Sequence, residues 1–170
     1  YWGPVKPKLD EVLVYSIPDG NTLTLAMQSG ELDAVQGLPY ASLPAFEKNG
    51  AYRILSSPTS RVYQAAMNYD TPALQDQRVR QAIWLAIDKD NVVSVLLRGN
   101  GLVAAGPFPD TFPFGQGVQG PAYDLERAKE LLREAGYTHT DRDGYVTKDG
   151  QPLTLCWLTY TSRQELPLLA

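Results

Sequence analysis

The side chains that carry most enzyme and metal chemistry are scarce in this sequence. His139 is the only histidine and Cys156 the only cysteine among 170 residues. A first-row metal site usually takes three or four donors from imidazole, thiolate or carboxylate groups, and a nucleophilic triad needs a histidine held by a second group. The phosphate loop GxxxxGK[ST] does not occur, and GxGxxG occurs once, at Gly115–Gly120, inside the non-periodic stretch 99–121 and not between an expected strand and helix. The sequence therefore predicts no catalytic residues, no metal site and no cofactor, and indicates a protein that is not an enzyme.

Two acidic stretches could be taken for sites. If Gly144 is the sixth residue of a calcium loop, Gly150 stands at position twelve, where a bidentate Glu is required, so an EF-hand is excluded. Glu31 and Asp33 are separated by a single residue. A catalytic carboxylate pair, however, acts from two sides of a cleft and not from one segment. We interpret both stretches as polar turns, and we expect Cys156, inside an apolar segment, to be a core residue.

Two arginines stand at the start of an expected helix. Arg78 and Arg80 flank Val79, and cations near a helix N-terminus oppose the helix dipole. We expect Asp76 or Asp70 to compensate them. We therefore interpret the two arginines as residues that hold the domain seam in place, and not as a ligand site.

Composition and charge exclude two classes of partner. Hydrophobic residues make up 44% and charged residues 20%, with a formal net charge of −4. Nucleic-acid binding needs clustered Lys and Arg, and a membrane span needs about 18 consecutive apolar residues. We expect no nucleic-acid partner and no direct membrane insertion.

The order of elements predicts an α/β protein with mixed sheets. Strands are expected at residues 11–16, 34–37, 53–56 and 61–68, and helices at 22–29, 42–48, 76–87, 91–98 and 125–135. Asn21 and Asp124 are the expected N-caps, and Gly30 and Gly136 the residues that end helices. A hairpin around Lys148-Asp149-Gly150 should join 145–147 to 153–160. Residues 99–121 lack periodicity but hold three phenylalanines, so they should pack along a surface.

One helix carries a clear apolar stripe. Its period places five side chains against a core: Val79, Ala82, Ile83, Ala86 and Ile87. Arg80, Gln81 and Lys89 should then face solvent or pair with acids.

Several short motifs, in this order, resemble the family-5 bacterial solute-binding proteins, which are the dipeptide, oligopeptide and nickel binders of ABC importers. The motifs are Ser29-Gly30-Glu31-Leu32-Asp33, Ala66-Met67-Asn68, Arg78-Val79-Arg80-Gln81-Ala82 with Ala86-Ile87-Asp88-Lys89, and Glu134-Ala135-Gly136-Tyr137. Residues 158–169 look closest to the nickel-binding branch. The resemblance covers essentially the whole chain, which we interpret as an internal fragment of a longer protein.

The resemblance implies a two-lobed, type II periplasmic-binding-protein-like fold of which only part is present. Residues 1–72 would belong to the first lobe and 73–170 would start the second, with a seam near 68–77. The implied function is transport: capture of nickel, free or as a chelate, or of short peptides, and delivery to ABC permease subunits. Arg61 and Tyr63 are the expected ligand-side residues. The implied location is periplasmic or extracellular, with or without a lipid anchor.

An alternative function stays open at this point. The same domain, fused to a DNA-binding region, would be the ligand-sensing module of a transcriptional regulator. The sequence before Tyr1 would discriminate the two, since a secretory signal and a helix-turn-helix cannot both occupy it.

Overall fold

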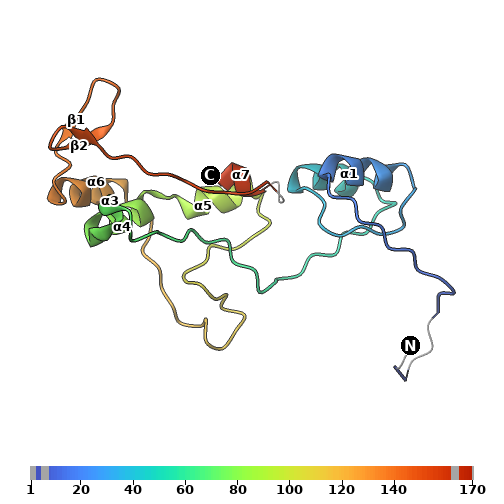
Figure 1. Cartoon of the computed structure of the whole chain (residues 1–170). Helices are drawn as coiled ribbons and strands as arrows, with labels where there is room; N and C mark the ends of the chain where they lie inside the picture. Colours follow the sequence, from blue (N-terminus) through green and yellow to red (C-terminus); the bar gives the residue numbers. More distant parts are fainter. Residues whose placement is uncertain (1–2, 5–7, 162–164, 170) are drawn as a thin grey trace. The chain divides into compact units, whose positions relative to one another are not determined.

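The structure is a computed structural model that describes residues 3–4, 8–161 and 165–169. The chain divides into two compact units, Tyr1–Tyr52 and Arg53–Ala170, and Figure 1 traces them by residue number. Each unit is described by itself. The expected lobe boundary near residue 72 concerns a longer two-lobed protein and stays a prediction.

The first unit is helical. It contains α1 (Gly20–Gln28), the 3₁₀ turn η1 (Tyr40–Ser42) and α2 (Leu43–Glu47). Asp19 caps α1, because its Oδ1 accepts a 2.7 Å hydrogen bond from Thr22 N; the expectation that Asn21 is the cap was wrong by two residues. Gly30 ends the helix at a φ of 78°, as expected. The apolar core is small, with Ala26 and Phe46 buried.

The second unit is built around two packed helices. Its helices are α3 (Pro72–Gln75), α4 (Gln77–Ala86), α5 (Lys89–Asn91), the π-helical turn η2 (Val92–Leu96), α6 (Leu125–Glu134) and α7 (Glu165–Leu169). Helices α4 and α6 pack on each other through Ala82, Ala128 and Leu131, with Leu85 and Leu132 at the edge. Two of the three central side chains are methyl groups, so the helix backbones approach closely.

The end caps of α6 are those that the sequence predicts. Asp124 Oδ1 accepts from Arg127 N at 2.9 Å. At the other end Gly136 has a φ of 100°, and Tyr137 N donates to Leu132 O at 2.9 Å. These bonds satisfy backbone groups that a helix end leaves without an intrahelical partner.

The sheet among the described residues is small and antiparallel. Its strands β1 (His139–Thr140), β2 (Val146–Lys148) and β3 (Gln151–Pro152) lie in the order β1-β2-β3, with His139 opposite Thr147 and Thr147 opposite Pro152. Asp149 and Gly150 both have positive φ, 52° and 75°, which is the type I′ turn of a two-residue hairpin. The hairpin turn is confirmed. Strand β1 lies in the segment that the sequence analysis took for part of a polar turn.

The other expected strands form no ladder within the described residues. Segments 11–16, 34–37, 53–56 and 61–68 pair with no strand there. Segment 153–160 contributes only the bond from Leu153 N to Val146 O at 2.8 Å, so the expected mixed sheet is absent from the described residues. Val14 and Leu158 are 89% and 88% exposed. A strand that is apolar on both faces needs neighbours along both edges and cover on both faces. Cys156 is consequently exposed, and the expectation that it is a core residue was wrong.

The apolar stripe of α4 is only partly buried. Val79 and Ala82 are 1% and 2% exposed, as expected, whereas Ile83 is half-buried. Ala86 and Ile87 are exposed, because α4 ends at Ala86 and Ile87 has an extended backbone. Burial therefore stops where the helical period stops.

The three polar positions expected outside that stripe differ from one another. Gln81 is exposed, as expected. Arg80 is half-buried and bonds carbonyl oxygens instead of acids. Lys89 is also half-buried and donates to Pro121 O at 3.1 Å.

The helices of the described chain include none with both the length and the apolar character of a membrane span.

Candidate functional site

The two residues that the sequence analysis assigned to the ligand lie in one extended segment. Arg61 is exposed, and its backbone N–H donates to Thr59 Oγ1 at 3.2 Å. Tyr63, two residues on, is half-buried. The Arg61 guanidinium has no hydrogen-bond or ion-pair partner among the described residues, so its planar fork of donors is available to a carboxylate. Their role in ligand binding stays a prediction.

A hydrogen-bonded turn connects this segment to helix α3. Asn68 Oδ1 accepts from Asp70 N at 3.0 Å, and Asn68 O accepts from Thr71 N at 3.1 Å. Pro72 then begins α3, a position at which its missing N–H is not needed. The Asp70-Thr71-Pro72 sequence is therefore an ordered turn.

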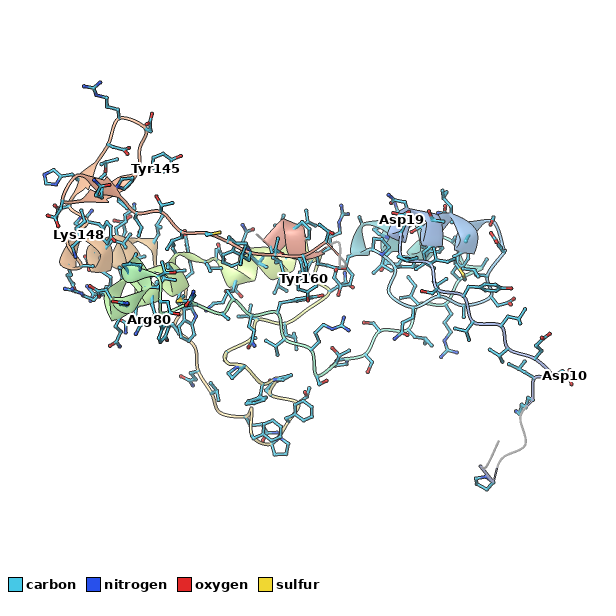
Figure 2. All side chains as sticks on the ribbon, viewed as in Figure 1. Asp10, Asp19, Arg80, Tyr145, Lys148 and Tyr160 are labelled. Atoms are coloured by element: carbon cyan, nitrogen blue, oxygen red, sulfur yellow. The ribbon has the colours of Figure 1, made fainter. Side chains whose placement is uncertain are left out.

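Arg80 ties this turn and α3 to α4. Its Nη1 donates to Leu74 O at 2.8 Å and to Gln75 O at 2.9 Å, and its guanidinium carbon lies 4.5 Å from the centre of the Tyr69 ring. Arg80 is labelled in Figure 2. The guanidinium thus satisfies carbonyl groups at the end of α3 and stacks on an aromatic face.

Asp76 and Arg78 form the start of α4. Asp76 Oδ1 accepts from Arg78 N at 2.9 Å, and the two side chains form a two-pronged ion pair with distances of 3.0 Å and 2.6 Å. The hydrogen bonds from Arg78 lower the pKa of Asp76 to about 2, and the same pair raises the pKa of Arg78. Asp76, and not Asp70, therefore compensates Arg78, whereas Arg80 bonds carbonyl oxygens and has neither acid as a partner.

The C-terminal end of α6 receives two cations from elsewhere in the unit. Arg78 Nη1 donates to Glu134 O, and Lys148 Nζ donates to Ala135 O at 2.9 Å. Cations are favourable at this end of a helix dipole. The sequence analysis missed both contacts, because no local signal shows which distant carbonyl a long cationic side chain will reach.

The acidic stretches are turns in the structure. Asp141 Oδ1 accepts from the N–H groups of Asp143 and Tyr145, at 3.0 Å and 2.8 Å. Within the described residues, no three His, Cys, Asp or Glu side chains gather where they could hold a metal ion. Glu31 is exposed at the rim of an open, shallow hollow beside α1, whose lining also includes Thr22, Leu25 and Ser29.

Comparison with known proteins finds a family match, a curated relative and similar solved structures. A family model described as "Bacterial extracellular solute-binding proteins, family 5 Middle" matches residues 1–169. The glutathione-binding protein GsiB of Pectobacterium atrosepticum is 32% identical over 137 residues, which are 81% of this chain and 27% of GsiB.

Two of the similar solved structures carry bound ligands. NikA from Brucella suis, in complex with Fe(III)-EDTA, has a TM-score of 0.78 at 38% identity, covering 90% of this chain and 32% of NikA. DppA from Helicobacter pylori, in complex with the peptide STSA, has a TM-score of 0.68 at 31% identity, covering 82% of this chain and 27% of DppA. The chain thus spans 27% to 32% of the length of these relatives.

Proposed function

The chain belongs to the bacterial extracellular solute-binding proteins of family 5, and from this membership we propose that it is part of the ligand-capturing component of an ABC importer. The observation that carries the proposal is the family match over residues 1–169. The superposition on NikA over 90% of the chain supports it, since it matches part of the periplasmic-binding-protein fold. The proteins of this family bind solutes and are not enzymes.

The chemistry shared by the relatives' ligands narrows the ligand class. Fe(III)-EDTA, a peptide and glutathione all present carboxylate oxygens, and these are the ligands named for NikA, DppA and GsiB. We propose that this protein captures a carboxylate-bearing solute, either a nickel chelate or a short peptide. Arg61 is the proposed carboxylate partner, because its exposed guanidinium matches the two carboxylate oxygens. Tyr63 is the proposed packing contact beside it.

The proposed mechanism is capture by closure of two lobes. Residues 1–72 would belong to one lobe and 73–170 to the other, and hinge motion would enclose the solute. The extended segments 11–16, 61–68 and 153–160 would be strands of the lobes' sheets, which accounts for exposed apolar side chains such as Val14 and Leu158. The closed form would dock on permease subunits in the periplasm or at the cell exterior.

Calorimetry on the intact gene product tests this proposal. The ligands are Ni(II)-EDTA, glutathione and a tripeptide without a thiol, and we expect one of them to bind with a micromolar or lower Kd. Arg61→Met should weaken that binding about tenfold to a hundredfold, the range for a charge-assisted hydrogen bond. Arg53→Met is the matched control, because Arg53 is also exposed and its side chain has no partner among the described residues.

Two results would count against the proposal. Failure of all three ligands to bind would overturn the assigned solute class. Specific retention of a DNA duplex by the intact gene product would instead favour the regulator alternative. Equal affinities of the Arg61 and Arg53 variants would remove Arg61 from the site and leave the capture function standing.

A further inference from the structure

In the second unit, residues 68–75 connect the extended segment that carries Arg61 and Tyr63 to the packed helices α4 and α6. This connection is held by several hydrogen bonds. Residues 68–75 contain a side-chain-capped turn at Asn68, a backbone turn to Thr71 and the short helix α3, whose Leu74 N donates to Thr71 O at 2.9 Å. Within α3, Ala73 and Leu74 are half-buried. This stretch is therefore internally stiff.

Arg80 joins the stiff stretch to α4. The two bonds from Nη1 are made to carbonyls of consecutive residues, Leu74 and Gln75, while the ring of Tyr69 lies under the guanidinium at 4.5 Å. One side chain therefore holds both ends of the stretch, its start at Tyr69 and its end at Gln75. Because the guanidinium is planar and its donors are fixed, the three contacts also define an orientation.

Helix α4 is in turn fixed to α6. Ala82 packs against Ala128 and Leu131 in the core, and Arg78 Nη1 donates to Glu134 O at the end of α6. Residues 69–75 are thus attached to Arg80 of α4, and α4 is attached to α6. Lys148 in turn attaches α6 to the sheet.

The chain before Asn68 is different. From Arg53 to Met67, the one backbone N–H with a hydrogen-bond acceptor among the described residues is that of Arg61, and its acceptor is the nearby Thr59 side chain. Residues 53–61 are all exposed.

We propose that Arg80 is a clamp that makes residues 69–76 part of the rigid α4–α6 body, so that bending between the lobes takes place outside this stretch. The bending part of this inference rests on the proposed two-lobed function. The clamp itself does not, and it can be measured without ligand. The clamp would remove residues 69–76 from the expected seam at 68–77 and would move residues 69–72 from the first proposed lobe to the second.

Amide hydrogen exchange of the intact gene product, followed by mass spectrometry, tests the clamp. In the wild type, the amides of residues 71 and 73–76 should be protected to an extent that approaches α4; Pro72 has no amide hydrogen. Arg80→Met keeps a long helix-forming side chain but removes both hydrogen bonds, and should speed exchange in 71–76 about tenfold or more, with exchange in α6 unchanged. Arg80→Lys keeps the positive charge and N–H donors but loses the planar guanidinium, and should fall between the two.

Arg133→Lys is the matched control, because Arg133 is exposed on α6 and its side chain has no partner among the described residues; its exchange pattern should equal that of the wild type. Equal exchange of 71–76 in the wild type and in both Arg80 variants would overturn the clamp. If Arg80→Met fails to fold, Arg80→Lys alone decides. A wild type that binds no solute yet shows the Arg80 effect would contradict the proposed function and leave the clamp intact.

Discussion

Asp76 combines two roles that are often separate at the start of a helix. It caps α4 through Arg78 N and pairs with the Arg78 side chain, while that same guanidinium reaches the end of α6. The carboxylate therefore stabilises a helix end directly and holds in place a cation that links two helices. This arrangement predicts a pH-dependent contribution to stability.

Replacing Asp76 separates these roles. Asp76→Ala should lower the free energy of unfolding by about 1–2 kcal/mol near neutral pH, because it removes cap and ion pair together. Asp76→Asn should cost less, since Asn is also a good cap. Urea unfolding of both variants, with Asp70→Asn as the control, checks the order; an equal cost for Asn and Ala would show that the cap contributes nothing.

The pH dependence has a defined sign. The folded-state pKa of Asp76, about 2, lies below the ordinary value of 3.8, so the ionised form favours the folded state. Its contribution is complete above about pH 5 and is lost as the pH falls toward 2. The difference in unfolding free energy between wild type and Asp76→Asn should therefore shrink over that window. A difference that stays constant from pH 6 to pH 3 would contradict the pairing.

Position 115 requires glycine because a side chain there would have no room, and not because of its backbone angles. A Cβ at this position would lie 2.1 Å from Pro109 O, in a loop where Phe108 and Phe112 pack on Phe114 at centroid distances of 5.0 Å and 5.1 Å. Gly115→Ala should lower stability by about 1–3 kcal/mol and weaken the near-ultraviolet circular dichroism of the phenylalanines. Gly50→Ala, where the added carbon meets nothing within 4 Å, should leave both measurements unchanged.

At the scale of elements, the contact between α4 and α6 depends on small side chains. Ala82 and Ala128 are each 2% exposed, and they face one another in the core cluster. Larger side chains at this contact would separate the helices. Since Arg78 bridges the same two helices, separation would also break that hydrogen bond.

Ala82→Leu is therefore expected to cost about 1–3 kcal/mol by overpacking. Ala86→Leu, one turn further along the same helix and exposed, adds the same atoms with a change within about 0.5 kcal/mol. Thermal unfolding of the two variants checks the difference. Similar melting temperatures would show that α4 and α6 do not pack through Ala82.

At the scale of the whole molecule, the question is whether these two units could enclose a solute. The hollow beside α1 is shallow and open, whereas a small solute usually loses about 70–90% of its surface on binding. The chain also spans 32% of NikA, with which it superposes over most of its own length.

Residues 1–170 by themselves are therefore expected to have no measurable affinity for Ni(II)-EDTA, glutathione or other short peptides, whereas the intact gene product binds one of them. Calorimetry under the same conditions compares the two. The isolated chain must first show the far-ultraviolet signal of its helices, which serves as the control for folding. Micromolar binding by the isolated chain would show that these units form a complete site.

Helices and turns could be predicted from this sequence because their hydrogen bonds are local. The cap at Asp124, the C-terminal glycine at Gly136 and the Asp149-Gly150 turn all connect residues that are at most a few positions apart. The same locality explains the errors: the capping residue of α1 was displaced by two positions, and the stripe of α4 was extended to Ile87, past the helix end. Family membership also follows from residue order alone.

Tertiary structure decided the contacts that link distant segments. No pattern in the sequence shows that Arg80 reaches Leu74 O and Gln75 O, or that Arg78 and Lys148 meet at the end of α6, because each acceptor is a backbone carbonyl that every residue possesses. The exposed apolar segments around Val14 and Leu158 also show that long-range contacts cannot be predicted from local composition. Their composition is that of strands, but a strand's hydrogen bonds are made to another segment, so composition alone does not form one.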